Sequence, residues 1–357
     1  MAGNATHHEI AAAAHLGGRL ISRVFTMKHV HVVIPDLFLP QSLAKEVCAG
    51  LSLPVLEKFL ARSKASSLPT HSLEAWLCEA FAVPDSAIAP VTLLADGLKP
   101  EDGYWLRADP VHLRLDRSQM ILQTNISVSL EDAQQLCAYL NQHFADSGMR
   151  FFAPHPQRWY VRLEDSPELV THSVYQVEGR NSRFYLPQGA TALKWHGVMN
   201  EIQMVLYGHP INQACAERGA LPPNSVWLWG GGRAVALPRP FDLLYGDSEL
   251  AISFAQAANI AHVRTLEEKA QFENALYVSE GLSAALRRGD FHTWRESVTV
   301  LERDCLAPLL RLLVAGEIDR ITLDVLQEEN SRRYELTRPM LWKVWLRAQP
   351  LANYALV

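Results

Sequence analysis

The sequence predicts an α/β protein, a three-layer sandwich with a mostly parallel central sheet and a smaller inserted α+β subdomain. Two observations lead to this prediction. Short apolar runs typical of buried parallel strands alternate with stretches of helical periodicity, and this alternation is typical of sheets covered by helices on both faces. The region 105–190 is richer in strand and poorer in helix, which indicates the insert.

The first predicted strand is Val30–Ile34, shortly after a second methionine, Met27. We interpret Met27 as the functional start, because such strands commonly open a domain. The preceding residues lack the apolar core of about 7–15 residues that a secretory signal needs. The expected division is a weakly ordered leader at 1–26, a main α/β domain at 27–104 and 191–357, and the inserted subdomain at 105–190.

Capping residues mark the clearest helices. Ser72 is placed to cap a helix running to Phe81. Ser129 with Asp132 has the form of a capping box and predicts a helix to about Phe144. The other predicted elements are a helix from Leu43 interrupted at Pro54, strands at 105–109, 112–115, 158–163, 173–177, 226–229 and 320–324, and helices at 195–207 and 292–315, the last divided by Pro308.

Composition excludes several classes of protein. Hydrophobic residues make up 48% and charged residues 20% of the chain, which excludes wholesale disorder, collagen and coiled coil. No apolar run reaches the roughly 18 residues of a membrane-spanning helix. A net charge of −5 argues against nucleic acid or an anionic membrane as partner. The five cysteines are scattered, so we expect reduced thiols and a cytoplasmic protein.

Two features suit ligand binding from their position alone, and each has a plainer alternative. The turn Gly230–Gly232 follows a predicted strand, where α/β sheets bind ligands, and Arg233 would pair with a phosphate or a carboxylate. The alternative, which spacing alone favours, is a tight turn with a solvated arginine. Asp36 ends the first strand, where carboxylates often hold a metal or cofactor. An Asx turn or helix cap is an equally good interpretation.

One longer segment carries a family resemblance. From Lys194 a predicted helix leads to His209-Pro210-Ile211-Asn212, then to Arg218-Gly219, Pro222-Pro223-Asn224 and a strand ending in the glycine turn. This order resembles the archaeal-type cofactor-independent phosphoglycerate mutases, of the alkaline-phosphatase superfamily. A bacterial, regulator-like branch is similar over the whole length from Met27. The ligand-binding candidates that follow are His209, Asn212, Arg218, Asn224, Gly231, Gly232 and Arg233.

The resemblance implies a site for two metal ions, built from Asp and His at strand ends, and a transiently phosphorylated serine. This sequence departs from that pattern. Of the first motif only Asp36 remains, and Val325 stands where the family has a histidine after the last strand. The remaining metal candidates are Asp36, Glu280 and Asp324, with Asp290 as a weaker one. No catalytic residue is assigned, and Ser66, Ser67 and Ser72 are nucleophile candidates only by elimination.

Two functions follow as hypotheses. The first is a mutase-like protein whose metal site is depleted, that is, a pseudoenzyme without a cofactor. Such a protein would bind a phosphorylated metabolite or a protein partner and act as a regulator. The second is an active mutase or phosphatase with rearranged ligands, in which Asp36, Glu280, Asp324 and a histidine from elsewhere in the chain hold Mn²⁺, Mg²⁺ or Zn²⁺. We favour the first, because two-metal catalysis depends on a full ligand set. The segment around Pro210 and Asn212 has structural roles without any ligand, so it indicates fold rather than activity.

Overall fold

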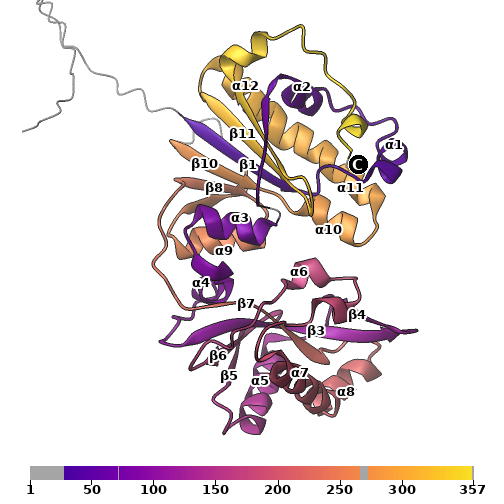
Figure 1. The fold of residues 1–357 in the computed structure, drawn as a ribbon, viewed down its shortest axis with the longest axis vertical. Coiled ribbons are helices and arrows are strands. Elements are labelled where there is room, and N and C mark those ends of the chain that lie inside the picture. Colours follow the sequence, from indigo (N-terminus) through magenta and orange to yellow (C-terminus); the bar gives the residue numbers. More distant parts are fainter. Residues whose placement is uncertain (1–27, 71, 266–271, 356–357) are drawn as a thin grey trace, which may run out of the picture.

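The computed structural model describes residues 28–70, 72–265 and 272–355, so the expected leader at 1–26 lies outside the described residues. The chain forms two parts, each built on its own sheet (Figure 1). The seven strands of the first sheet are, in spatial order, β2 (Lys64–Ser67), β12 (Arg332–Thr337), β11 (Arg320–Leu326), β1 (His29–Pro35), β10 (Asn274–Val278), β8 (Leu243–Gly246) and β9 (Ala261–Val263).

The predicted mostly parallel sheet is confirmed. Strand β1 lies at its centre, with His29 opposite both Asn274 of β10 and Arg320 of β11. Strands β11, β1, β10, β8 and β9 run parallel, whereas β12 is antiparallel to β11 and β2 is antiparallel to β12. The carboxyl ends of the parallel strands therefore meet at one edge of the sheet, which is where α/β sheets place ligand sites.

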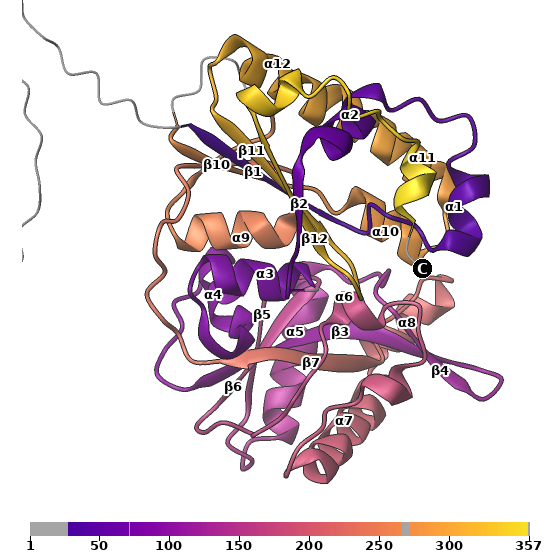
Figure 2. The same cartoon turned by 45° about the horizontal axis from the view of Figure 1, so that its top comes forward.

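Helices cover both faces of this sheet, as a three-layer sandwich requires (Figures 1 and 2). Alternating side chains divide the core, because Val32 and Ile34 join one buried cluster while Val33 joins the other. The helices packed on the Val32 face are α1 (Gln41–Val47), α2 (Pro54–Arg62), α10 (Gly281–Arg287), α11 (Phe291–Val300) and α12 (Ala307–Ala315). Those on the Val33 face are α3 (Leu73–Ala80) and α9 (Glu249–Ala257).

The second part is an antiparallel sheet with helices against it, and it is larger than the sequence predicted. Its strands are β4 (Gln119–Gln123), β3 (Tyr104–Asp116), β6 (Arg158–Leu163) and β5 (Arg150–His155), with β7 (Ser225–Gly232) paired to β3. Its helices are α4 (Ile88–Ala95), α5 (Leu130–His143), α6 (Val174–Val177), α7 (Ala192–Tyr207) and α8 (Pro210–Glu217).

The pairing of β7 corrects the expected boundary at residue 190. Strand β7 was expected in the parallel sheet, yet it is antiparallel to β3, so the second sheet runs to Gly232. The physical reason is that a fully buried apolar run has the same appearance in either sheet. Short 3-10 helices complete the fold at Pro84–Ser86, Ser182–Tyr185, Arg338–Trp342 and Leu351–Tyr354.

The helices predicted from capping residues were confirmed, whereas a segment whose capping residues were overlooked was predicted wrongly. Ser72 and Ser129 cap α3 and α5 as expected. The strand predicted at 173–177 is instead α6, because Ser173 and Gln176 form a reciprocal capping box. The strands predicted at 105–109 and 112–115 are one strand, β3. Within the described residues no helix is long and apolar enough to cross a membrane.

The glycine turn offers a test of this packing. A Cβ atom on Gly232 would lie 2.1 Å from the Cβ of Ala87, whereas one on Gly197, within α7, would meet nothing within 4 Å. We expect Gly232→Ala to lower the free energy of unfolding by about 1–3 kcal/mol through overpacking. Gly197→Ala is the matched control and should raise it by about 0.5–1 kcal/mol. Urea unfolding measures the free energy of unfolding of both variants. Equal changes in the two would contradict the close contact between Gly232 and Ala87.

Candidate functional site

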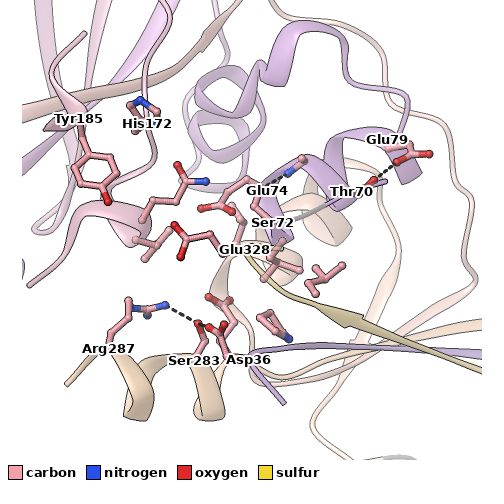
Figure 3. A pocket seen from close by; sticks show the side chains of 18 of the residues that line it. Asp36, Thr70, Ser72, Glu74, Glu79, His172, Tyr185, Ser283, Arg287 and Glu328 are labelled. Atoms are coloured by element: carbon pink, nitrogen blue, oxygen red, sulfur yellow. Dashed lines mark hydrogen bonds between the residues drawn. The ribbon is translucent and has the colours of Figure 1, made fainter. Parts of the chain in front are cut away.

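A cavity of about 750 Å³ lies between the two parts of the molecule. The first part contributes Asp36, which follows β1, and Glu280, Ser283 and Arg287 at helix α10. The second part contributes Arg180, which follows α6, and His172, which precedes it and is labelled in Figure 3. The cavity therefore lies at the carboxyl end of β1, the position where parallel sheets bind ligands.

Asp36 is held in a strained backbone conformation. Its φ of 57° lies in the left-handed region, which a residue other than glycine adopts only at a cost. Two hydrogen bonds fix the peptide groups around it, from the Asp36 amide to the Leu326 carbonyl at 2.9 Å and from the Trp294 indole to the Asp36 carbonyl at 3.2 Å. Burial raises the pKa of the Asp36 carboxyl, although the hydroxyl of Ser283 donates to its Oδ2 at 2.5 Å.

Arg287 links α10 to the second part. Its Nη1 donates to the Ser283 hydroxyl at 2.8 Å, and its Nε donates to Oε2 of Glu178, at the end of α6, at 3.2 Å. The guanidinium also lies 5.9 Å from the ring centre of Tyr175. The side chain is 17% exposed, so it faces the cavity from a fixed position.

A second arginine spans the cavity at its more open side. Nη1 of Arg180 donates to the Tyr185 hydroxyl at 3.1 Å and to Oε1 of Glu328, from the first part, at 3.2 Å. The Arg180 and Glu328 side chains are 44% and 78% exposed, so the ion pair contributes little stability. An anionic ligand would thus displace Glu328 from Arg180 at small cost.

Two glutamates add acidic groups to the cavity lining. Glu280 precedes α10 and accepts a hydrogen bond from the Ser248 hydroxyl, and Glu74 of α3 accepts one from the Ser173 hydroxyl. Burial raises the pKa of Glu280 to about 7, and the charges of Glu74 and Asp247 add to this rise. The Glu280 carboxyl therefore gains its negative charge as the pH rises through neutrality.

Asp324, the third predicted metal candidate, is engaged elsewhere. It is fully buried in β11, and Arg333 on the adjacent strand β12 donates to both of its oxygens at 2.7 Å. The Trp76 indole and His31 Nε2 contact Oδ2 at 2.7 and 2.8 Å. Burial alone would raise the pKa of Asp324, but the hydrogen bonds and charges of Arg333 and His31 outweigh it and hold the pKa well below its usual range.

The structure therefore brings two of the three metal candidates together. Asp36 and Glu280 line one cavity, whereas Asp324 is not among its lining residues. The weaker candidate, Asp290, caps α11 through the Thr293 amide. Across residues 28–70, 72–265 and 272–355, no three His, Cys, Asp or Glu side chains form a group able to hold a metal ion.

The segment that carries the family resemblance makes structural hydrogen bonds. His209 caps α8 by accepting from the Ile211 amide. The Asn212 amide donates to the carbonyls of Leu206 and Pro223 at 2.8 and 2.6 Å. Asn224 exchanges two hydrogen bonds with the Leu113 backbone in β3.

The glycine turn and its neighbours are likewise apart from the cavity. Gly231 and Gly232 pack against the second part, where a Cβ atom would clash with Leu106 or Ala87. Arg218 is exposed, and the half-exposed Arg233 donates to the Glu164 carbonyl at 3.2 Å. None of the seven predicted ligand-binding residues lines the cavity, and their binding role stays a prediction.

Sequence reasoning missed most of the cavity. Arg180, Arg287 and Tyr175 are single residues without a local motif, and they meet only through tertiary packing. The capping box at α6 was the one local signal near them. Of the candidate serines, Ser72 lines the cavity and caps α3, whereas Ser66 and Ser67 are exposed in β2.

Comparisons with known proteins agree with this architecture. The family model described as 2,3-bisphosphoglycerate-independent phosphoglycerate mutase matches residues 96–212. A mutase of that description from Methanosarcina acetivorans is 27% identical over 128 residues, 35% of this chain and 32% of that protein. One from Methanothrix thermoacetophila is 30% identical over 106 residues, 30% of this chain and 27% of that protein. The chain thus matches about a third of the length of these curated relatives.

A solved structure extends the likeness to the fold. The PH0037 protein from Pyrococcus horikoshii superposes with a TM-score of 0.52 at 12% identity, covering 87% of each chain. The sequence match at 96–212 lies mainly in the second part, away from Asp36, Glu280 and Asp324. The family model therefore matches outside the segments that carry the metal candidates, whereas the fold likeness covers 87% of the chain.

The Asp324 pair gives a stability prediction. Asp324→Asn should lower the free energy of unfolding by about 3 kcal/mol, because it breaks a buried ion pair. The loss should be largest at neutral pH and shrink in acid, since a carboxyl with a depressed folded pKa stabilises only above that pKa. Asp304→Asn, which removes a solvent-exposed pair with Arg303, is the control and should leave the free energy of unfolding nearly unchanged. Equal losses in urea unfolding would refute this role for Asp324.

Proposed function

We propose that the cavity binds a phosphorylated small molecule and that the chain, which is similar over residues 96–212 to the 2,3-bisphosphoglycerate-independent phosphoglycerate mutases, works as a binding or regulatory protein. Its three-layer architecture is the alkaline-phosphatase-like fold of that family. The observation that carries the proposal is the engagement of Asp324 by Arg333, Trp76 and His31.

The residues present do not fit a site for two metal ions. Such a site needs several carboxylate and imidazole ligands that converge on a pair of cations. Asp324 already accepts four hydrogen bonds, two of them from a guanidinium whose positive charge takes the place of a cation's. Of the predicted ligands Asp36 and Glu280 remain in the cavity, and within the described residues they belong to no group of three His, Cys, Asp or Glu side chains that could hold even one ion.

The cavity does suit a phosphate group. Arginine binds phosphate through several parallel N–H donors, and the cavity is lined by two arginines, Arg180 of the second part and Arg287 of α10. Each is held by one exposed or half-buried glutamate that a stronger anion would replace, Glu328 for Arg180 and Glu178 for Arg287. His172 and Gln176 add further polar groups at the cavity wall.

One observation favours the second candidate function, an active mutase or phosphatase. Asp36, Glu280 and Ser72 line the same cavity, so a carboxylate pair and a candidate nucleophile share one site. That function would need a metal ligand set in which another group replaces Asp324. The sequence analysis also named a protein partner as an alternative to a phosphorylated metabolite. Binding of such a partner would give the chain a regulatory role within the same proposal.

Binding can be tested with 3-phosphoglycerate as the probe. We expect it to raise the melting temperature, and Arg180→Ala to weaken its affinity by about 10-fold, because a hydrogen bond to a charged group contributes about 1.5–3 kcal/mol. Arg233→Ala is the matched control and should leave the affinity unchanged; the reverse pattern would place the site at the glycine turn. Elemental analysis and a mutase assay complete the test, and two bound metal ions per chain with mutase turnover would establish the active alternative.

The same binding should depend on pH through Glu280. Its pKa of about 7 means that the carboxyl is neutral below and charged above that pH. We expect affinity for 3-phosphoglycerate to fall roughly 5-fold between pH 6 and 8, from a repulsion on the order of 1 kcal/mol. Glu280→Gln should remove this fall. The second ionisation of the phosphate near pH 6 affects both proteins alike, so identical pH profiles would show that Glu280 does not face the ligand.

A further inference from the structure

Helix α7 carries two stripes of side chains on opposite faces, and only one of them meets the core of the second part. The inner stripe is buried and consists of Trp195, Met199, Ile202 and Leu206. The outer stripe is exposed and consists of Leu193, Gly197, Asn200, Met204 and Tyr207. Its apolar members Leu193, Met204 and Tyr207 are 86%, 72% and 80% exposed. A surface helix normally has one apolar face, so the outer stripe of α7 is a face without its neighbour.

We propose that the outer stripe of α7 packs against the same stripe of a second copy of this chain, as an antiparallel pair of helices about a two-fold axis. This surface is separate from the cavity, because none of its five residues lines the cavity. Helices α5 and α7 lie on the face of the second sheet that is turned away from the first part (Figures 1 and 2). A second copy can therefore approach α7 without meeting the rest of the molecule.

The spacing of the outer stripe is that of a helix seam. Its members follow one another at intervals of four, three, four and three residues, which is the repeat that keeps side chains against a partner helix. With the two-fold axis midway between Gly197 and Asn200, Leu193 of one copy lies opposite Met204 of the other, and Gly197 lies opposite Asn200. Large side chains thus meet apolar ones at both ends of the seam. At its centre Asn200 faces a residue without a side chain, where an added Cβ would meet nothing within 4 Å of its own chain.

The charges beside the stripe are complementary in this orientation. Lys194 and Glu201 lie on one flank of the seam, seven residues apart, and in an antiparallel pair this flank faces itself. Lys194 of each copy therefore lies opposite Glu201 of the other. Lys194 forms no ion pair with any described residue, and Glu201 is held at this flank by His143 of α5, whose Nε2 is 2.6 Å from Oε1. A parallel pair would instead set Lys194 against the flank of His196 and Gln203, which offers no carboxylate.

The other exposed apolar cluster suits a second copy less well. Trp342, Val344 and Trp345 are exposed after a short 3-10 helix near the C-terminus, without the spacing of a helix seam. Lys343 and Arg347 accompany them, so two copies placed face to face would bring like charges together. The charge pattern therefore favours α7 as the surface for self-association.

The size of the surface indicates a weak dimer. Helix α7 has 16 residues and is therefore about 24 Å long. Tyr139 of α5 widens the surface near the end of α7, where its ring packs edge-on against His209 with ring centres 4.8 Å apart. One helix pair with such additions is at the small end of specific interfaces, so we expect dissociation in the micromolar range.

Sedimentation equilibrium of the full chain tests the proposal. The average mass should rise from the 40.0 kDa of one chain towards twice that value as the protein concentration passes through the micromolar range. Met204→Glu should keep the protein monomeric throughout, because it would place a carboxylate against the partner's Leu193. Trp345→Glu, in the other exposed apolar cluster, is the matched control and should leave the association unchanged. Thermal melting followed by circular dichroism shows that each variant is folded.

A charge exchange tests the orientation of the two helices. Lys194→Glu should weaken the dimer by about 10-fold, because it replaces two attractions by two repulsions at the seam. Adding Glu201→Lys to the same chain should restore the association, since the antiparallel pair then has both charges exchanged. A mass of one chain at every concentration overturns the proposal, as does a dimer that Trp345→Glu dissociates and Met204→Glu does not. A dimer that the double exchange fails to restore overturns the antiparallel arrangement.

Discussion

The ion pair between Asp324 and Arg333 is the constraint on which the first part of the structure depends. A carboxylate buried at the centre of a sheet is tolerated only when charge and hydrogen bonds compensate it. The compensation needs β12 antiparallel to β11, because that pairing sets Arg333 directly opposite Asp324. It also draws in His31 from β1 and Trp76 from α3, so one side chain ties three strands and a helix together.

The sequence allowed much of this fold to be predicted, and the misses have physical causes. Strand β1 and helices α3, α5 and α7 were predicted because caps and periodicity are local signals. Strand β7 was assigned to the wrong sheet, since a fully buried run does not say which neighbour it pairs with. The strand expected at 173–177 failed because its apolar residues outweighed a capping box that lay in the same segment.

The candidate site was predictable only where a residue ends a strand. Asp36 and Glu280 follow β1 and β10, so topology alone places them at one edge of the sheet. Asp324 had the same kind of signal, but its partner Arg333 belongs to a strand that was not predicted. The arginines of the cavity come from both parts, and nothing in their flanking sequence states that the parts meet there.

The position of β1 also sets the order in which the chain can fold during synthesis. Its partners, β10 and β11, begin at Asn274 and Arg320, so the central strand cannot pair on either side until about 240 further residues have been made. The second sheet is complete once Gly232 has been made. Because non-local parallel pairing is slow and leaves apolar strands uncovered, the apolar side chains of β1 stay without their sheet partners until β10 and β11 have been made.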